Sequence, residues 1–241
     1  MVKRIALTGI VALSVLAAAA CSSGTTTSTT QGGAAAASST QTSSKPLSAY
    51  LLQQSDVPSG YQQQQLPPGA ADAVGSLTAA TKGAKVTPAS CQPDLSGFDA
   101  QQALSAPKAI FANGATGATI VTAVSTKSAG TNGSVEGFRR YNLGDCATHQ
   151  ITTSVGGSTV TATQKATQLT VDTPGVSGAV AARLETVAQI PGSSERTTEQ
   201  LVALLPIPDG AVLVSVNNLT GQPDEAAFRQ VVAAASKKIS G

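Results

Sequence analysis

The clearest hydrophobic pattern is helical and lies close to the C-terminal end. Between residues 224 and 239 the apolar positions recur three and four residues apart and form one stripe: Ala227, Phe228, Val231, Val232, Ala235 and Ile239. Acidic side chains begin this segment and two lysines end it, and charges placed in this way interact favourably with the helix dipole. A second helix is predicted over residues 135–142, where Val135, Phe138 and Tyr141 are three residues apart.

Most other apolar positions follow the two-residue period of β-strands. Strands are predicted at residues 108–113, 118–126, 147–155, 159–171, 178–189, 200–205 and 212–218. Short glycine-containing turns join neighbouring segments, at 114–117 and 156–157, and such turns favour antiparallel pairing. Short helices are expected at 47–52 and near 99–104, whereas residues 62–90 are rich in turn-forming residues and carry no predicted element.

These elements predict one α+β domain over residues 47–241. The length suits a single domain with a core of its own. We expect an antiparallel sheet with helices packed on one face, which makes a two-layer sandwich.

The N-terminal region reads as an export signal. Lys3 and Arg4 precede an apolar stretch, residues 5–16, which is shorter than the roughly 20 residues of a spanning helix. Alanines then lead directly to Cys21. The pattern predicts a signal peptide over residues 1–20 and a lipid on Cys21, whose acyl chains would hold the protein at the outer face of a membrane. Ordinary secretion with cleavage after the alanines is the alternative.

Residues 21–46 are predicted to be a disordered tether behind the lipidated Cys21. Between residues 22 and 46, 14 of 25 positions are Ser or Thr, and Lys45 is the only charge. Such a stretch buries too little apolar surface to offset the entropy of ordering it.

Charge argues against nucleic acid as a partner. The full chain has 15 Lys and Arg against 13 Asp and Glu, and loss of Lys3 and Arg4 with the signal peptide leaves 13 against 13. Aromatic residues make up 3% of the chain and tryptophan is absent, so side chains that stack on bases are few.

Two cysteines remain once Cys21 is assigned to the lipid. Cys91 and Cys146 would sit in an oxidising compartment, where the default is a disulfide. Neither belongs to a C-x-x-C motif, so a structural bond is favoured over a redox role.

Catalytic patterns are weak. His149 is the only histidine, and a hydrolase would need it beside a serine and a carboxylate. Ser105 and Lys108 match S-x-x-K, but the intervening proline disfavours the helix that this motif requires. Glu195 and Glu199 lack the sugar-stacking aromatics of a glycosidase. We therefore expect a protein that is not an enzyme and carries no cofactor.

No metal site is expected either, because one histidine and two paired cysteines do not supply three or four ligands. The residues 114–117 contain two glycines but lack the lysine of a phosphate-binding loop. Arg139 and Arg140 are interpreted as a solvated helix face, with contact to an anionic headgroup as the alternative.

Several of these features together resemble envelope lipoproteins of mycobacteria and their relatives. They are Cys21-Ser-Ser-Gly24, the Ala/Gly/Ser/Thr tether, the opening Leu51-Leu-x3-Asp-Val-Pro-x-Gly60, the single cysteine pair and the closing amphipathic helix. Within this group, the helix leading into Cys146 and the final strand and helix are similar to the sensor-type extracellular domain of some mycobacterial receptor kinases and free lipoproteins. That resemblance implies ligand sensing or binding at the envelope.

The leading hypothesis is therefore a non-enzymatic, lipid-anchored domain on the extracytoplasmic face of the cell membrane. It would bind an unknown protein or small-molecule ligand. A carrier of a lipid or other apolar ligand is the alternative, because Ala and Val dominate the apolar residues and could line a slot. A hydrolase centred on His149 is a third, less favoured hypothesis.

Overall fold

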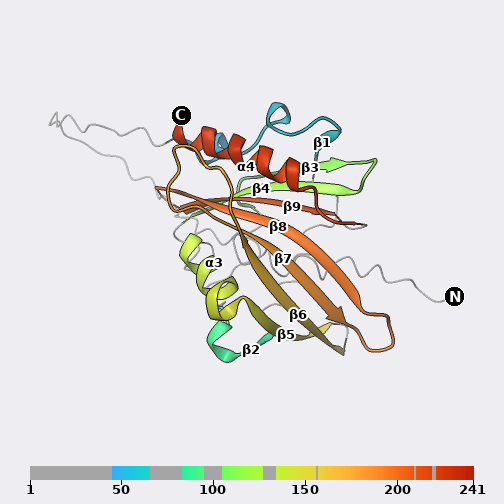
Figure 1. Ribbon diagram of the computed structural model, residues 1–241. Coiled ribbons are helices and arrows are strands. Elements are labelled where there is room, and N and C mark those ends of the chain that lie inside the picture. Colours follow the sequence, from blue (N-terminus) through green and yellow to red (C-terminus); the bar gives the residue numbers. More distant parts are fainter. Residues whose placement is uncertain are drawn as a thin grey trace, which may run out of the picture.

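A computed structural model describes residues 45–65, 83–94, 105–126, 134–155, 157–208, 210–218 and 221–241. These residues form one nine-stranded sheet in the order β1-β3-β4-β9-β8-β7-β6-β5-β2, and every neighbouring pair is antiparallel (Figure 1). The predicted signal peptide, Cys21, the tether up to residue 44 and the helix near 99–104 lie outside the described residues.

The elements have the following bounds. The strands are β1 (Tyr61–Gln64), β2 (Lys85–Thr87), β3 (Lys108–Asn113), β4 (Ala118–Thr126), β5 (Thr148–Val155), β6 (Ser158–Leu169), β7 (Val180–Gln189), β8 (Arg196–Ile207) and β9 (Gly210–Asn218). The α-helices are α3 (Val135–Asn142) and α4 (Glu225–Ser240), and the 3-10 turns are η3 (Leu47–Tyr50), η4 (Gln54–Asp56), η5 (Ala89–Cys91) and η8 (Gly144–Cys146).

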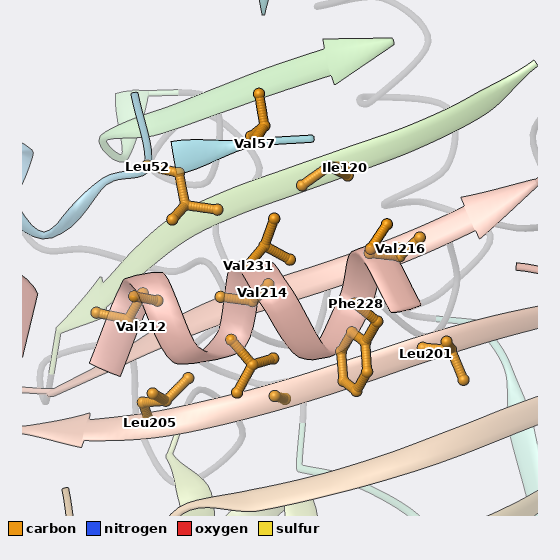
Figure 2. Close-up of a cluster of buried hydrophobic side chains, with 14 of the residues drawn as sticks. Leu52, Val57, Ile120, Leu201, Leu205, Val212, Val214, Val216, Phe228 and Val231 are labelled. Atoms are coloured by element: carbon orange, nitrogen blue, oxygen red, sulfur yellow. The ribbon is translucent and has the colours of Figure 1, made fainter. Parts of the chain in front are cut away.

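Helix α4 covers one face of the sheet, which we call the α4 face (Figure 1). Its apolar stripe packs on strands β3, β4, β9 and β8, and Phe228 and Val231 are fully buried there. Figure 2 shows these two side chains directed at the strands that carry Val212, Val214 and Leu205. The helix begins where the Asp224 carboxylate accepts a hydrogen bond from the Ala227 amide at 2.9 Å.

Helix α3 covers the opposite face, which we call the α3 face. Along the central strands, the residues that alternate with those of the α4 face direct their side chains to the α3 face. Phe138 packs against these residues, among them Val202 and Leu204 of β8. The Ser134 hydroxyl caps this helix by accepting a hydrogen bond from the Gly137 amide at 2.9 Å. The sheet therefore has a core on each side.

The predicted packing of the helices on one face of the sheet is wrong. The antiparallel sheet is confirmed, but the described chain is predominantly sheet and its two α-helices lie on opposite faces. The reason lies in β8, where Leu201 to Leu205 are all buried. A strand that is apolar at successive positions must be covered on both sides.

Element boundaries follow the predictions closely where the pattern is strong. Helix α3 and strands β3 and β4 have the predicted bounds. Strand β8 is longer than predicted, because polar residues from Arg196 to Glu199 continue the ladder with β7. Strands β1 and β2 were not predicted, since each is short and the pairing that defines them is long-range.

Candidate functional site

Buried polar side chains gather on the α3 face. Strand alternation and register place six of them there: Ser125, His149, Thr153, Gln164, Gln200 and Ser215. Burying a polar group costs free energy unless it gains a partner, so most cores hold few of them. This face is therefore the candidate functional site of the domain.

His149 and Gln164 are direct partners across strands β5 and β6. The ring Nδ1 of His149 lies 2.9 Å from the carbonyl oxygen of Cys146, and the residue is 7% exposed. A carbonyl oxygen can only accept, so Nδ1 carries the proton in this contact. Among the described residues, no hydrogen bond joins His149 to a serine or a carboxylate.

Gln164 connects the sheet to helix α3. Its amide Nε2 donates to Asn142 Oδ1 at 2.9 Å, and Asn142 Nδ2 donates to the Phe138 carbonyl at 3.2 Å. The last turn of α3 is thus held above β6 by side-chain hydrogen bonds. Gln164 and Asn142 were not among the predicted site residues, although a glutamine at an inward position of an alternating strand was a signal that could have identified the first.

Two hydroxyl groups on the α3 face have no hydrogen-bond partner among the residues that the structure describes. Ser215 is fully buried on β9 and Ser125 is 2% exposed on β4. An unsatisfied buried hydroxyl costs about 1–3 kcal/mol. Each hydroxyl can donate one hydrogen bond and accept others, and in the described part of the chain neither bonds a histidine or carboxylate that would activate it as a nucleophile.

An apolar strip continues the α3 face beside these hydroxyls. Ile110 and Val121 are cross-strand partners on β3 and β4, and Val121 is also the register partner of Ser215. Ile110, Val121 and Ala123 are only half-buried. The chemistry of this region suits hydrophobic contact with scattered hydrogen bonding.

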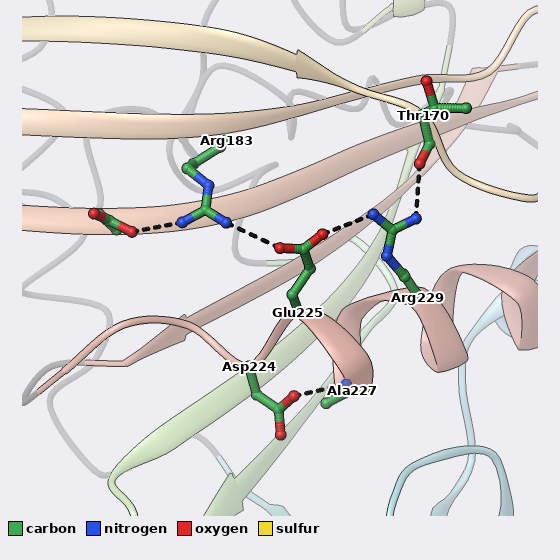
Figure 3. A network of polar contacts seen from close by, with 7 residues as sticks. Thr170, Arg183, Asp224, Glu225, Ala227 and Arg229 are labelled. Atoms are coloured by element: carbon green, nitrogen blue, oxygen red, sulfur yellow. Dashed lines mark hydrogen bonds and ion pairs between the residues drawn. The ribbon is translucent and has the colours of Figure 1, made fainter.

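The α4 face carries a charged network at the start of helix α4 (Figure 3). Arg183 of β7 donates to Glu199 at 2.9 Å and to Glu225 at 3.1 Å. Arg229 bonds the other oxygen of Glu225 at 2.7 Å and the Thr170 carbonyl at 2.9 Å. The network joins the helix to the sheet.

Two pKa values are shifted near this end of the helix. The hydrogen bond from Arg229 lowers the pKa of Glu225, and the positive charges of Arg229 and Arg183 add to the effect. Burial raises the pKa of the Tyr61 phenol, and the Asp224 carboxylate raises it further. Both shifts accompany packing of α4 on the sheet.

The predicted disulfide between Cys91 and Cys146 is present. It joins η5 to η8 beside Val86 and Ile151, across 55 positions of the chain. The bond therefore fixes the segment containing β2 to the beginning of β5.

The other candidate residues have ordinary contacts. Arg139 donates to the carbonyls of Gly178 and Ala179, at 3.2 and 3.0 Å, and the Arg140 guanidinium lies 5.4 Å from the centre of the Tyr141 ring. Both arginines are exposed. One of them thus fastens α3 to the start of β7.

The remaining motifs are not brought together. Ser105 is exposed, and the Lys108 ammonium donates to the Ala106 carbonyl at 2.9 Å. Glu199 pairs with Arg183, whereas Glu195 is exposed in the turn before β8. The glycines at 114 and 117 lie in the turn between β3 and β4.

The described residues contain no group of three or more His, Cys, Asp or Glu side chains that could hold a metal ion. No helix in this part of the chain has both the length and the apolar character needed to span a membrane.

Comparison with known proteins finds no family model that matches and no curated protein that matches. Among solved structures, an uncharacterized protein from Mycobacterium smegmatis, the Rv0999 ortholog, shares 14% sequence identity with a TM-score of 0.39. The match covers 78% of this chain and 93% of that one. These comparisons do not support the resemblance to the sensor-type domain.

Proposed function

We propose that this protein is a lipid-anchored domain on the extracytoplasmic face of the cell membrane, where it binds a ligand or protein partner without catalysing a reaction. The observation that carries the proposal concerns its cysteines. The chain has three, and Cys91 and Cys146 are bonded to each other. Cys21 is left without a cysteine partner, directly behind the predicted export signal, where lipidation would use it.

The arrangement of the polar groups supports a binding role. His149 is held by a backbone carbonyl, and the buried hydroxyls of Ser125 and Ser215 have no hydrogen bond to a base among the described residues. A rigid nine-stranded sheet presents these groups on one face. Such a face can recognise a ligand.

Intact mass of the protein purified from cell membranes tests the anchor. The mass should equal the chain from Cys21 onward with its acyl chains, less two protons for the disulfide. A Cys21→Ser variant should lose the acyl mass and leave the membrane fraction. A wild-type chain without acyl mass would refute the anchor.

Transport of a lipid or other apolar molecule is the second candidate. The observation that favours it is the half-buried apolar strip of Ile110, Val121 and Ala123 beside Ser215. Native mass spectrometry would show extra mass that denaturation releases. A Val121→Asp variant should lose this mass, whereas Thr159→Asp, on the exposed α4 face of β6, should retain it.

A further inference from the structure

The two edges of the sheet are closed in the same manner. Among the described residues, each edge strand has one row of backbone groups that pairs with no other strand. Such a row is a template for pairing with another chain. In both edge strands, a glutamine side chain from an adjacent 3-10 turn occupies part of the row.

At β1 the glutamine is Gln54, from η4. Its Nε2 donates to the backbone carbonyl of Tyr61 at 2.7 Å, and its Oε1 accepts from the backbone N–H of Gln63 at 3.0 Å. Residues two apart in a strand direct their backbone groups to the same side. The primary amide of Gln54 thus takes the place that a backbone N–H and a backbone C=O of a tenth strand would occupy.

At β2 the glutamine is Gln92, which directly follows η5. Its Oε1 accepts from the Val86 amide at 2.7 Å, and its Nε2 donates to the Ala84 carbonyl at 3.4 Å, a longer contact. The pattern is again the carbonyl of one residue and the amide of the residue two positions later. The same geometry therefore occurs at opposite ends of the sheet, from glutamines 38 positions apart in the sequence.

Both glutamines are held in place by their surroundings. The Asp56 carboxylate accepts a hydrogen bond from the backbone N–H of Gln53 at 2.6 Å and forms an ion pair with Lys238 of α4 at 3.0 Å. These two contacts hold η4 in place. Gln92 follows Cys91, whose disulfide to Cys146 fixes η5. Each amide is therefore positioned in advance, so little entropy is lost when it bonds the strand.

We propose that Gln54 and Gln92 close the two edges of the sheet against strand addition, so that the domain does not pair edge to edge with a second copy of this chain. Edge pairing needs free amide and carbonyl groups in a row. The strands have only four and three residues, so one bidentate amide occupies a large part of the row: the Tyr61 carbonyl and Gln63 N–H at β1, and the Val86 N–H with the Ala84 carbonyl just before β2. This inference does not depend on the lipid anchor, although copies held at one membrane would meet more often.

The test uses the mature chain with Cys21→Ser, because a lipid would itself gather copies in micelles. Gln54→Met and Gln92→Met, singly and together, keep the side-chain length and remove both hydrogen bonds. Gln62→Met is the matched control, since Gln62 is an exposed glutamine of the same edge strand. Sedimentation velocity over a range of concentrations measures self-association, and hydrogen exchange of the peptides containing Gln63 and Val86 shows whether the edge has opened.

The Cys21→Ser parent and the Gln62→Met control should remain monomeric. The double methionine variant should exchange faster at both edges and show a self-association constant raised by about tenfold or more. Gln54→Glu and Gln92→Glu also lose the Nε2 donor but add charge, which discourages edge pairing, so they should stay monomeric.

Two results would overturn the proposal. One is a parent protein that already associates through its edges. The other is a methionine variant whose edges exchange rapidly while it remains monomeric. The single variants concern separate edges, so a variant that fails to fold leaves the other edge as the test.

Discussion

Gly175 lies directly against Ser240: a Cβ atom added to Gly175 would come 2.6 Å from the Cβ of Ser240. Gly175 belongs to the connection between β6 and β7, and Ser240 ends helix α4. Nearby, the Ser236 hydroxyl donates to the Pro174 carbonyl at 2.9 Å. The connection is thus packed closely against the C-terminal turn of the helix.

Substitution of Gly175 by alanine should destabilise the domain by both conformation and contact. Gly175 and Gly192 share a φ of +77°, but a Cβ at Gly192 meets no atom within 4 Å. Gly192→Ala should therefore cost about 1–2 kcal/mol for the left-handed backbone alone. Gly175→Ala should cost about 1–3 kcal/mol more, because overpacking adds to the strain. Urea unfolding measures the free energy of unfolding of both variants. Equal decreases would mean that Ser240 moves aside without an energetic cost and would contradict the prediction.

Truncation of Phe228 should be the most damaging single change on helix α4. The ring is fully buried against the α4 face, so Phe228→Ala should lower the free energy of unfolding by about 3–5 kcal/mol. Gln230→Ala, on the exposed side of the same helix, should change it by less than about 0.5 kcal/mol. Similar effects from the two variants would contradict the packing of α4 on the sheet.

The contribution of Glu225 to the stability of the domain should decrease as the pH falls. Its folded-state pKa is lowered, first by the hydrogen bond from Arg229, from a usual value of 4.5. A lowered carboxylate pKa means that the unfolded chain binds the proton more readily, so the stabilisation is present above the unfolded pKa and lost as pH falls through the folded one. Wild type should therefore melt above Glu225→Gln at about pH 7, and the difference should shrink as the pH falls below 4.5.

Thermal melts of wild type and Glu225→Gln from about pH 7 to below pH 4.5 measure this difference. Glu195→Gln, at an exposed carboxylate in the turn before β8, is the control and should follow wild type throughout. Added salt should reduce the difference at Glu225, since both groups of the pair are partly exposed. A difference that grows as the pH falls would contradict the assignment.

Loss of the disulfide should be costly because it closes a long loop. Replacing Cys91 and Cys146 together by serine should lower the free energy of unfolding by about 4 kcal/mol in the chain-entropy model. Wild type unfolded under reducing conditions should lose the same amount, whereas the double variant should be insensitive to reductant. A loss below about 1 kcal/mol would show that β2 and η5 are held mainly by other contacts.

Local patterns were sufficient for many elements of this fold. The three-residue spacing of Val135, Phe138 and Tyr141 predicted α3 at its observed bounds. The charges and apolar stripe of residues 224–239 predicted α4 almost as well, since the structure shows Asp224 as its cap. These predictions succeeded because helix period, capping and strand alternation act between residues close in the chain.

The candidate site could be predicted only in part. Pairing of Cys91 with Cys146 followed from the count of cysteines, whereas the contact between Gln164 and Asn142 did not. That contact exists because α3 crosses over β6, which is a tertiary relationship. The edge contacts of Gln54 and Gln92 were equally hidden, since any exposed glutamine in a turn has the same local pattern.

By itself, the sequence determined the approximate positions of both α-helices and most strands, which cysteines pair, and which residues near the N-terminus predict export and lipidation. The tertiary structure alone decided the strand order, the placement of the helices and the closure of the edges. Thr119 of β4 bonds Asn217 of β9 across 98 positions, and contacts of this kind set the order. They depend on which apolar faces meet, so no local pattern shows that Phe138 and Phe228 lie on opposite sides of one sheet.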